Sequence, residues 1–393
     1  DSRLRQKLAA RIDPRWYART TLGARASFWP GTDLLNMSTL APVVEGRQMY
    51  QVMAAFVARE ILSTGLWDGV FYDNTFDSIT WFTGPEIDLD ANGIRDQNPD
   101  AAWRAGMAAL YDETRRVSGG QYLIVGNGTT RAYSHKLNGQ MIENFLPAAW
   151  TPSMQTYAHL HDGGPLPRLN IINANTGNQG AENSYQAMRF GLSSALLANG
   201  YYSFDFGDRD HGQLWYYDEY EVDLGSSQGR AAAMNGGANF SPDVWRRDFD
   251  HGIALVNSAA VPHVVQLHGE FEKLHGIQDP RTNDGAIISE TTLSATDGLI
   301  LLKTLERLDD VVFQNGAFAR FLRPDGSIVR NGFFVFDEAY AGGVLVARAD
   351  LNEDGQRELI VARGNKLTVW RDDGQLYMQR HPYTANYKGE LHL

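Results

Sequence analysis

The feature that most constrains this chain is an alternation of short apolar runs with longer amphipathic segments over residues 1–225. Each run turns polar at its carboxyl end, and the runs lie at residues 33–38, 69–74, 122–127, 140–144, 169–173 and 200–205. Between them, apolar residues recur at helical spacing in residues 48–63, 99–117 and 184–198. This alternation predicts an α/β fold, with a parallel sheet covered by helices and polar groups at one edge of the sheet.

The number of apolar runs indicates whether the predicted parallel sheet can close into a barrel. About six strands can be placed, whereas a closed (β/α)8 barrel of the TIM type has eight. The simplest interpretation is a barrel domain over residues 1–235 whose first two strands precede Asp1. An open or incomplete barrel is the alternative.

Two further regions follow the predicted barrel. Residues 236–331 contain β-rich segments such as residues 297–303, DGLILLK, which predict a small antiparallel β-domain. Residues 332–393 contain an internal repeat, because VFDEAYAGGVLV at 335–346 aligns with PYTANYKGELHL at 382–393, an offset of 47 residues. A period of this length is typical of propeller blades, and the second copy stops early, so we expect a truncated, propeller-like repeat.

Composition excludes several classes of partner and chemistry. The net charge is −12 and Lys or Arg never occur in runs longer than two, which argues against nucleic acid and anionic membranes as partners. No apolar stretch approaches the ~20 residues that span a bilayer. With no cysteine, disulfides, thiolate zinc sites and cysteine nucleophiles are impossible. An acidic chain rich in Trp and Tyr suits an extracellular or cell-surface enzyme whose signal peptide was removed or lies upstream.

An acidic loop at residues 88–96 has the spacing of a calcium site. Oxygen-bearing side chains occupy positions 1, 3, 5 and 9, a glycine permits the turn at position 6, and position 7 offers its carbonyl. The predicted ligands are Asp88, Asp90, Asn92, Ile94 and Asp96. Position 12 is Pro99, so a sixth ligand must come from elsewhere, from Asp100 or water. A metal-free acidic turn is the alternative.

A second loop of the same pattern lies in the repeat region. Its predicted calcium ligands are Asp350, Asn352, Asp354, Gln356 and Glu358. Both calcium ions would be structural, because such loops hold a turn rigid and need no open coordination position. A turn without metal is again the alternative, and no motif for an organic cofactor is present.

Two carboxylates at predicted strand ends form the candidate catalytic pair. Asp73 ends DGVFYDN at residues 68–74, and Glu143 follows the run QMI two strands later. Cleavage of a glycosidic bond needs one carboxyl group to protonate the leaving oxygen and another to act as base or nucleophile. The alternative is that both residues only cap their strands.

Other strand ends and loops supply candidate substrate-binding residues. Amides and carboxylates at strand ends suit recognition of hydroxyl groups, and exposed aromatic faces stack on sugar rings. The predicted binding residues are Asn74, Asn127, Asn173, Asp205, Trp29 and Trp215. For Asp205, the alternatives to substrate binding are a structural hydrogen bond and catalysis. For the asparagines, the alternative is a hydrogen bond within a loop.

Two resemblances accompany these motifs. DGVFYDN followed by Glu143 resembles the endo-α-1,4-polygalactosaminidase family and related barrel glycosidases, which implies that Asp73 and Glu143 are catalytic. The loop and repeat after residue 333 are similar to the FG-GAP repeats of integrin-type propellers, which bind Ca²⁺.

Together these features predict an endo-acting glycoside hydrolase that cleaves O-glycosidic bonds of an extracellular or cell-envelope polysaccharide. Glu143 is the expected general acid and Asp73 the expected base or nucleophile. The competing hypothesis is a non-catalytic carbohydrate-binding or surface-assembly protein on a degenerate barrel. The oligomeric state does not follow from the sequence.

Overall fold

The computed structural model describes residues 2–303, 314–315, 318–322, 328–334, 345–352, 358–371, 375–384 and 391. The chain divides into two compact units. The first comprises Asp1–Ala174 and Ala198–Ser203, and the second comprises Asn175–Leu197 and Phe204–Leu393. The boundaries predicted at residues 235 and 331 stay predictions.

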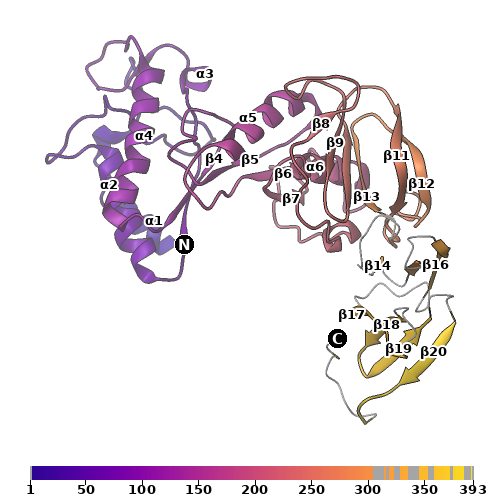
Figure 1. Cartoon of the computed structure of the whole chain (residues 1–393). Helices are drawn as coiled ribbons and strands as arrows, with labels where there is room; N and C mark the ends of the chain where they lie inside the picture. The colour runs from indigo at the N-terminus through magenta and orange to yellow at the C-terminus, as the bar shows by residue number, and fades with distance from the viewer. Residues whose placement is uncertain are drawn as a thin grey trace. The chain divides into compact units, whose positions relative to one another are not determined.

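A parallel sheet organises the first unit (Figure 1). Its strand order is β2-β4-β5-β6-β7, and the pairs from β2 to β6 are parallel. The strands are β2 (Gly69–Tyr72), β4 (Leu123–Asn127), β5 (Gly139–Ile142), β6 (Ile171–Asn175) and β7 (Tyr201–Asp205). A short pair, β1 (Arg19–Thr20) with β3 (Ile87–Asp88), is antiparallel. The prediction of a parallel sheet is therefore confirmed.

The expected strand over residues 33–38 is wrong. This segment forms only an isolated bridge, between Tyr17 and Leu35. Its buried Asn36 diverts the backbone, because the side-chain amide donates to the Leu89 carbonyl and its oxygen accepts from Ser38. Such side-chain bonds to the backbone compete with strand pairing. The described residues therefore contribute five strands to the sheet, and a closed eight-stranded barrel is not shown.

Helices pack on the parallel sheet as the periodicity predicts. The helices of the first unit are α1 (Ser2–Ala9), α2 (Met49–Phe56), α3 (Thr80–Thr83), α4 (Pro99–Ser118) and α5 (Trp150–Asp162). Helix α2 continues through a π-helical turn and a 3₁₀ turn to Thr64, and it packs side by side with α4 (Figure 1). Both bury apolar side chains in one core, which also contains Tyr72 of β2. Gly106 of α4 lies so close to the Met37 carbonyl that a Cβ could not fit.

The second unit is built around an antiparallel sheet. Its strand order is β12-β11-β13-β10-β9-β8. The strands are β8 (Ala232–Ala233), β9 (Val244–Asp248), β10 (Gly252–Asn257), β11 (His263–Lys273), β12 (Ile287–Leu293) and β13 (Asp297–Lys303). Helix α6 (Tyr185–Leu196) packs on β10 and β13, where Gly298 allows the helix backbone to approach. The expected antiparallel β-structure is confirmed, and β13 matches the predicted strand at residues 297–303.

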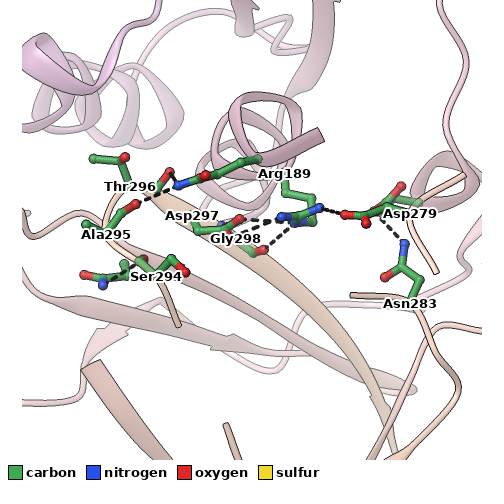
Figure 2. A network of polar contacts seen from close by, with 11 residues as sticks. Arg189, Asp279, Asn283, Ser294, Ala295, Thr296, Asp297 and Gly298 are labelled. Carbon is green, nitrogen blue, oxygen red and sulfur yellow. Dashed lines mark hydrogen bonds and ion pairs between the residues drawn. The ribbon is translucent and has the colours of Figure 1, made fainter. Parts of the chain in front are cut away.

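A buried charge network joins α6 to this sheet. Figure 2 shows Arg189 between Asp297 and Asp279. The guanidinium donates to both carboxylate oxygens of Asp297, at 3.1 and 3.2 Å, to the Gly298 carbonyl, and to Asp279. Burial raises the pKa of Asp297, although Arg189 opposes that shift. Burial lowers the pKa of Arg189, but Asp297 and Asp279 raise it more, so each buried charge depends on the other being present.

Two small antiparallel sheets lie toward the carboxyl end. One contains β14 (Gln314–Asn315), β15 (Phe318–Leu322) and β16 (Ile328–Phe334), and the other is a meander of β17 (Leu345–Ala349), β18 (Glu358–Arg363), β19 (Lys366–Trp370) and β20 (Leu376–Arg380). Most of the two repeat copies, at 335–346 and 382–393, lies outside the described residues. A propeller is therefore not shown.

Candidate functional site

The two predicted catalytic carboxylates meet at the carboxyl edge of the parallel sheet. Asp73 follows β2 and Glu143 follows β5, and β4 lies between these strands and ends at Asn127. The amide nitrogen of Asn127 donates to Asp73 Oδ1 at 3.0 Å and to Glu143 Oε2 at 2.8 Å. One side chain therefore holds both carboxylates. Asp73 is exposed and Glu143 is half-buried.

The shared nitrogen limits how far apart the carboxylates lie. The two bonded oxygens can be no farther apart than the sum of the two hydrogen-bond lengths. That limit is compatible with the ~5–5.5 Å between the carboxyl groups of retaining glycosidases.

An asparagine with left-handed backbone follows each carboxylate. Asn74 and Asn144 both have φ of 55°, a conformation that Asn tolerates better than most residues. The chain therefore turns away from the sheet directly after Asp73 and after Glu143. Asn74 also binds Asp73, donating its backbone N–H to Oδ1 at 2.8 Å and its amide to Oδ2 at 3.3 Å.

A cavity of about 370 Å³ opens beside Asp73 and Asn74. Trp29, which the sequence predicts as a binding residue, also lines it and is 51% exposed. Trp29 belongs to a cluster of edge-to-face rings around Phe28 that includes Trp81, itself 61% exposed. Two exposed indole rings thus lie together near one of the candidate catalytic groups.

The remaining predicted binding residues each contact another side chain. Asn173, on β6, is buried and donates to Ser203 Oγ at 2.9 Å. In the second unit, Asp205 ends β7 and its carboxylate accepts a hydrogen bond from His211 Nδ1 at 2.8 Å, while Trp215 packs against Phe204. His211 is therefore a loop partner of Asp205.

The first predicted calcium loop is curled around its acidic side chains. Asp88 accepts from the backbone N–H of Asn92 and of Gly93, and Asn92 accepts from Ile94. Burial raises the pKa of Asp96, and the nearby charges of Asp90 and Asp88 raise it further. The carboxylates therefore converge. Both oxygens of Asp100 accept hydrogen bonds from Thr80, and one also accepts from the Ile79 backbone N–H. A sixth ligand from Asp100 or water stays a prediction.

Calcium binding to this loop stays a prediction with a direct test. We expect Ca²⁺ to raise the midpoint of thermal unfolding of chelator-treated protein, because a ligand at 100 times its Kd stabilises by about 2.7 kcal/mol. Calorimetry with and without CaCl₂ measures the rise. Asp88→Asn should remove it, whereas Asp68→Asn, which alters an exposed carboxylate outside the loop, should keep it. Equal midpoints for the parent in both buffers would contradict a calcium site.

The second predicted calcium loop is described only in part. Asp354 and Gln356 lie outside the described residues. The buried carboxylate of Glu358 accepts from the backbone N–H of Leu351 at 2.9 Å and from the Asn352 amide at 3.2 Å. Calcium here also stays a prediction.

Comparison with known proteins assigns the family. The sequence model of the family described as hypothetical glycosyl hydrolase family 15 matches residues 3–253, more than half of the chain. This chain belongs to that glycosyl hydrolase family. The match differs from the endo-α-1,4-polygalactosaminidase family suggested by DGVFYDN, and no comparison supports an FG-GAP repeat. No curated protein matches the chain.

Solved structures resemble this chain only distantly. Isomalto-dextranase of Arthrobacter globiformis T6, complexed with panose, has 11% identity and a TM-score of 0.40, over 96% of this chain and 70% of that one. An uncharacterized protein of Listeria monocytogenes EGD-e has 12% identity and a TM-score of 0.39, over 93% and 37%. The cycloalternan-degrading enzyme of Trueperella pyogenes, complexed with isomaltose, has 12% identity and a TM-score of 0.36, over 76% and 46%. The chain spans less than half the length of these last two, and similarity this low carries no argument about activity.

Among the described helices, none is both long and apolar enough to cross a membrane.

Proposed function

We propose that this protein hydrolyses O-glycosidic bonds and retains the anomeric configuration, with Asp73 as nucleophile and Glu143 as general acid and base. The observation that supports this most directly is the Asn127 amide, which donates to both carboxylates and so keeps them close. Asp73 accepts three hydrogen bonds, from the Asn127 amide and from the backbone and side chain of Asn74. These donors fix the orientation of the Asp73 oxygens, which suits a nucleophile.

The reaction has two steps. Glu143 donates its proton to the leaving glycosidic oxygen while an Asp73 oxygen attacks the anomeric carbon, so the C–O bond breaks and a glycosyl ester forms. Glu143, now ionised, then removes a proton from water, and the hydroxide oxygen attacks the same carbon and releases Asp73. Both residues end in their starting states. Nuclear magnetic resonance of the first-formed product tests the proposal: an inverted anomer would contradict it.

The substrate, mode of attack and location form the less direct part of the proposal. The predicted substrate is an extracellular or cell-envelope polysaccharide attacked within the chain, by a protein outside the cell or on its surface. The exposed indoles of Trp29 and Trp81, near Asp73, support binding of sugar rings. Release of reducing ends from a panel of polysaccharides, with product sizes followed over time, tests substrate and mode together. A carbohydrate-binding protein without activity would bind members of the panel and release nothing.

Asn127→Ala should lower kcat by about 10- to 100-fold with little change in KM. The variant removes a donor to two charged groups, and a hydrogen bond to a charged group contributes ~1.5–3 kcal/mol. Because the amide orients the carboxylates, it is a positioning residue, so the pH profile of kcat should also change. Asn199→Ala, at an asparagine outside the site, is the control. A raised KM with unchanged kcat and pH profile would show that Asn127 binds substrate instead.

A further inference from the structure

The cavity beside Asp73 is lined mostly by apolar and aromatic side chains. Asp73 and Asn74 stand on one side, with Asp33 and Thr32 from the preceding loop. The loop, β2, α2 and α4 supply the apolar lining, which includes Trp29, Leu34, Met37, Met53, Met107 and Leu110. Asp33 is already paired with Arg25. A few polar side chains therefore share one cavity with methionine, leucine and aromatic side chains.

Two aromatic side chains of the lining, Tyr72 and Trp103, have hydrogen-bond partners for their polar atoms. Tyr72 Oη bonds to Thr114 Oγ1 at 2.7 Å, and the Trp103 indole N–H donates to the Phe76 carbonyl at 2.9 Å. A sugar ring placed inside would lose hydration at its hydroxyl groups and gain few partners. Each such unsatisfied group costs ~1–3 kcal/mol. The methionine and leucine part of the lining therefore favours aliphatic groups over a bare sugar.

We propose that this cavity binds an aliphatic chain carried by the glycoside substrate, so that the enzyme acts on a sugar bearing an alkyl or acyl group. The substrate assignment rests on the proposed function, because only the hydrolytic role of Asp73 makes the cavity part of a glycosidase site. Asp73 itself lines the cavity, so a sugar held at this carboxylate lies close enough for its substituent to enter. A nucleophile approaches the ring face opposite the leaving oxygen, which favours a chain on the sugar ring over one on the leaving group.

Chain-length dependence of binding tests the proposal without requiring turnover. Titration calorimetry of the Asp73→Asn variant would use two series below their micelle concentrations: n-alkyl glucosides and 6-O-acyl esters of methyl glucoside, from two to eight carbons. Each buried methylene should tighten binding about fourfold until the cavity is filled. A steep ester series places the chain on the ring, and a steep alkyl series places it on the leaving group. Affinity independent of chain length in both series would overturn the proposal.

Filling the cavity provides the matched control. Met53→Trp should abolish the chain-length dependence, as should Leu34→Phe in the loop, which perturbs no helix. Val43→Trp, at an exposed position outside the cavity, should leave the dependence unchanged. Retained dependence in both folded filling variants would place the chain elsewhere and overturn the proposal.

Failure of this proposal is distinguishable from failure of the proposed function. A flat series in a protein that hydrolyses glycosides removes the aliphatic chain and leaves the hydrolase. A steep series in a protein that hydrolyses no glycoside, with or without a chain, leaves the cavity ligand and removes the catalytic role of Asp73.

Discussion

Asp73→Asn should lower kcat for glycoside hydrolysis by about 10³-fold or more, because an amide cannot form the glycosyl ester. Glu143→Gln should show a loss that depends on the substrate. Without a proton donor, cleavage slows most when the leaving oxygen is basic, so natural glycosides should be affected severely and dinitrophenyl glycosides far less. The two residues are nearly isosteric with their replacements, which keeps packing constant. Steady-state kinetics on both substrate types measures each effect.

Asp68→Asn is the matched control for these variants. Asp68 is an exposed carboxylate that precedes β2, at the opposite end of the strand from Asp73, so the charge change is identical. Its kcat should stay within about twofold of the parent. Parent-like activity of Asp73→Asn would refute the catalytic pair. If the loss of activity depended on the leaving group in Asp73→Asn and not in Glu143→Gln, the assigned roles would be reversed.

Arg189→Met should destabilise the second unit by about 3–5 kcal/mol, the largest effect on stability that we expect. The variant removes the cation that faces both Asp297 and Asp279, and a buried ion pair broken on one side leaves an uncompensated charge. Only 7% of the Arg189 side chain is exposed, so solvent cannot replace the lost partner. Urea unfolding, and then calorimetry, measures the change in the free energy of unfolding.

Two further variants distinguish the effect of leaving a buried charge unpaired from the effect of removing any cation on the free energy of unfolding. Lys273→Met removes one partner of the ion pair with Asp284, which is more exposed, and should cost less than about 1 kcal/mol. Arg189→Met combined with Asp297→Leu should recover part of the stability, because the stranded carboxylate is gone. Equal costs for Arg189→Met and Lys273→Met would contradict the explanation from burial.

The sequence predicts which residues end the strands better than it predicts which side chains those residues contact. Asp73 and Glu143 can be recognised from the sequence alone, because each is a polar residue at the end of an apolar run. That Asn127 bridges them depends on the strand order and on the register, in which Asn127 lies opposite Met141. Neither follows from composition or period. The donor was therefore predicted as a contact for substrate, whereas the structure places it between the two carboxylates.

The apolar cavity was missed because its helical lining has the spacing of ordinary core. Met53, Trp103 and Met107 recur at positions that predict a buried face, and they are indeed buried or half-buried. Whether such residues meet their neighbours tightly or leave a space depends on how α2, α4 and the preceding loop pack. The strand expected over residues 33–38 failed for a related reason, since the competing bond of Asn36 reaches Leu89, far along the chain.

The division of the chain has a consequence for how the protein can be taken apart. The backbone passes from one compact unit to the other between residues 174 and 175, 197 and 198, and 203 and 204. Strands β6 and β7 are thus each shared by both units. A protease that cuts any one of these junctions therefore leaves two fragments of which at least one contains residues of both units. Neither unit is a single continuous stretch of polypeptide.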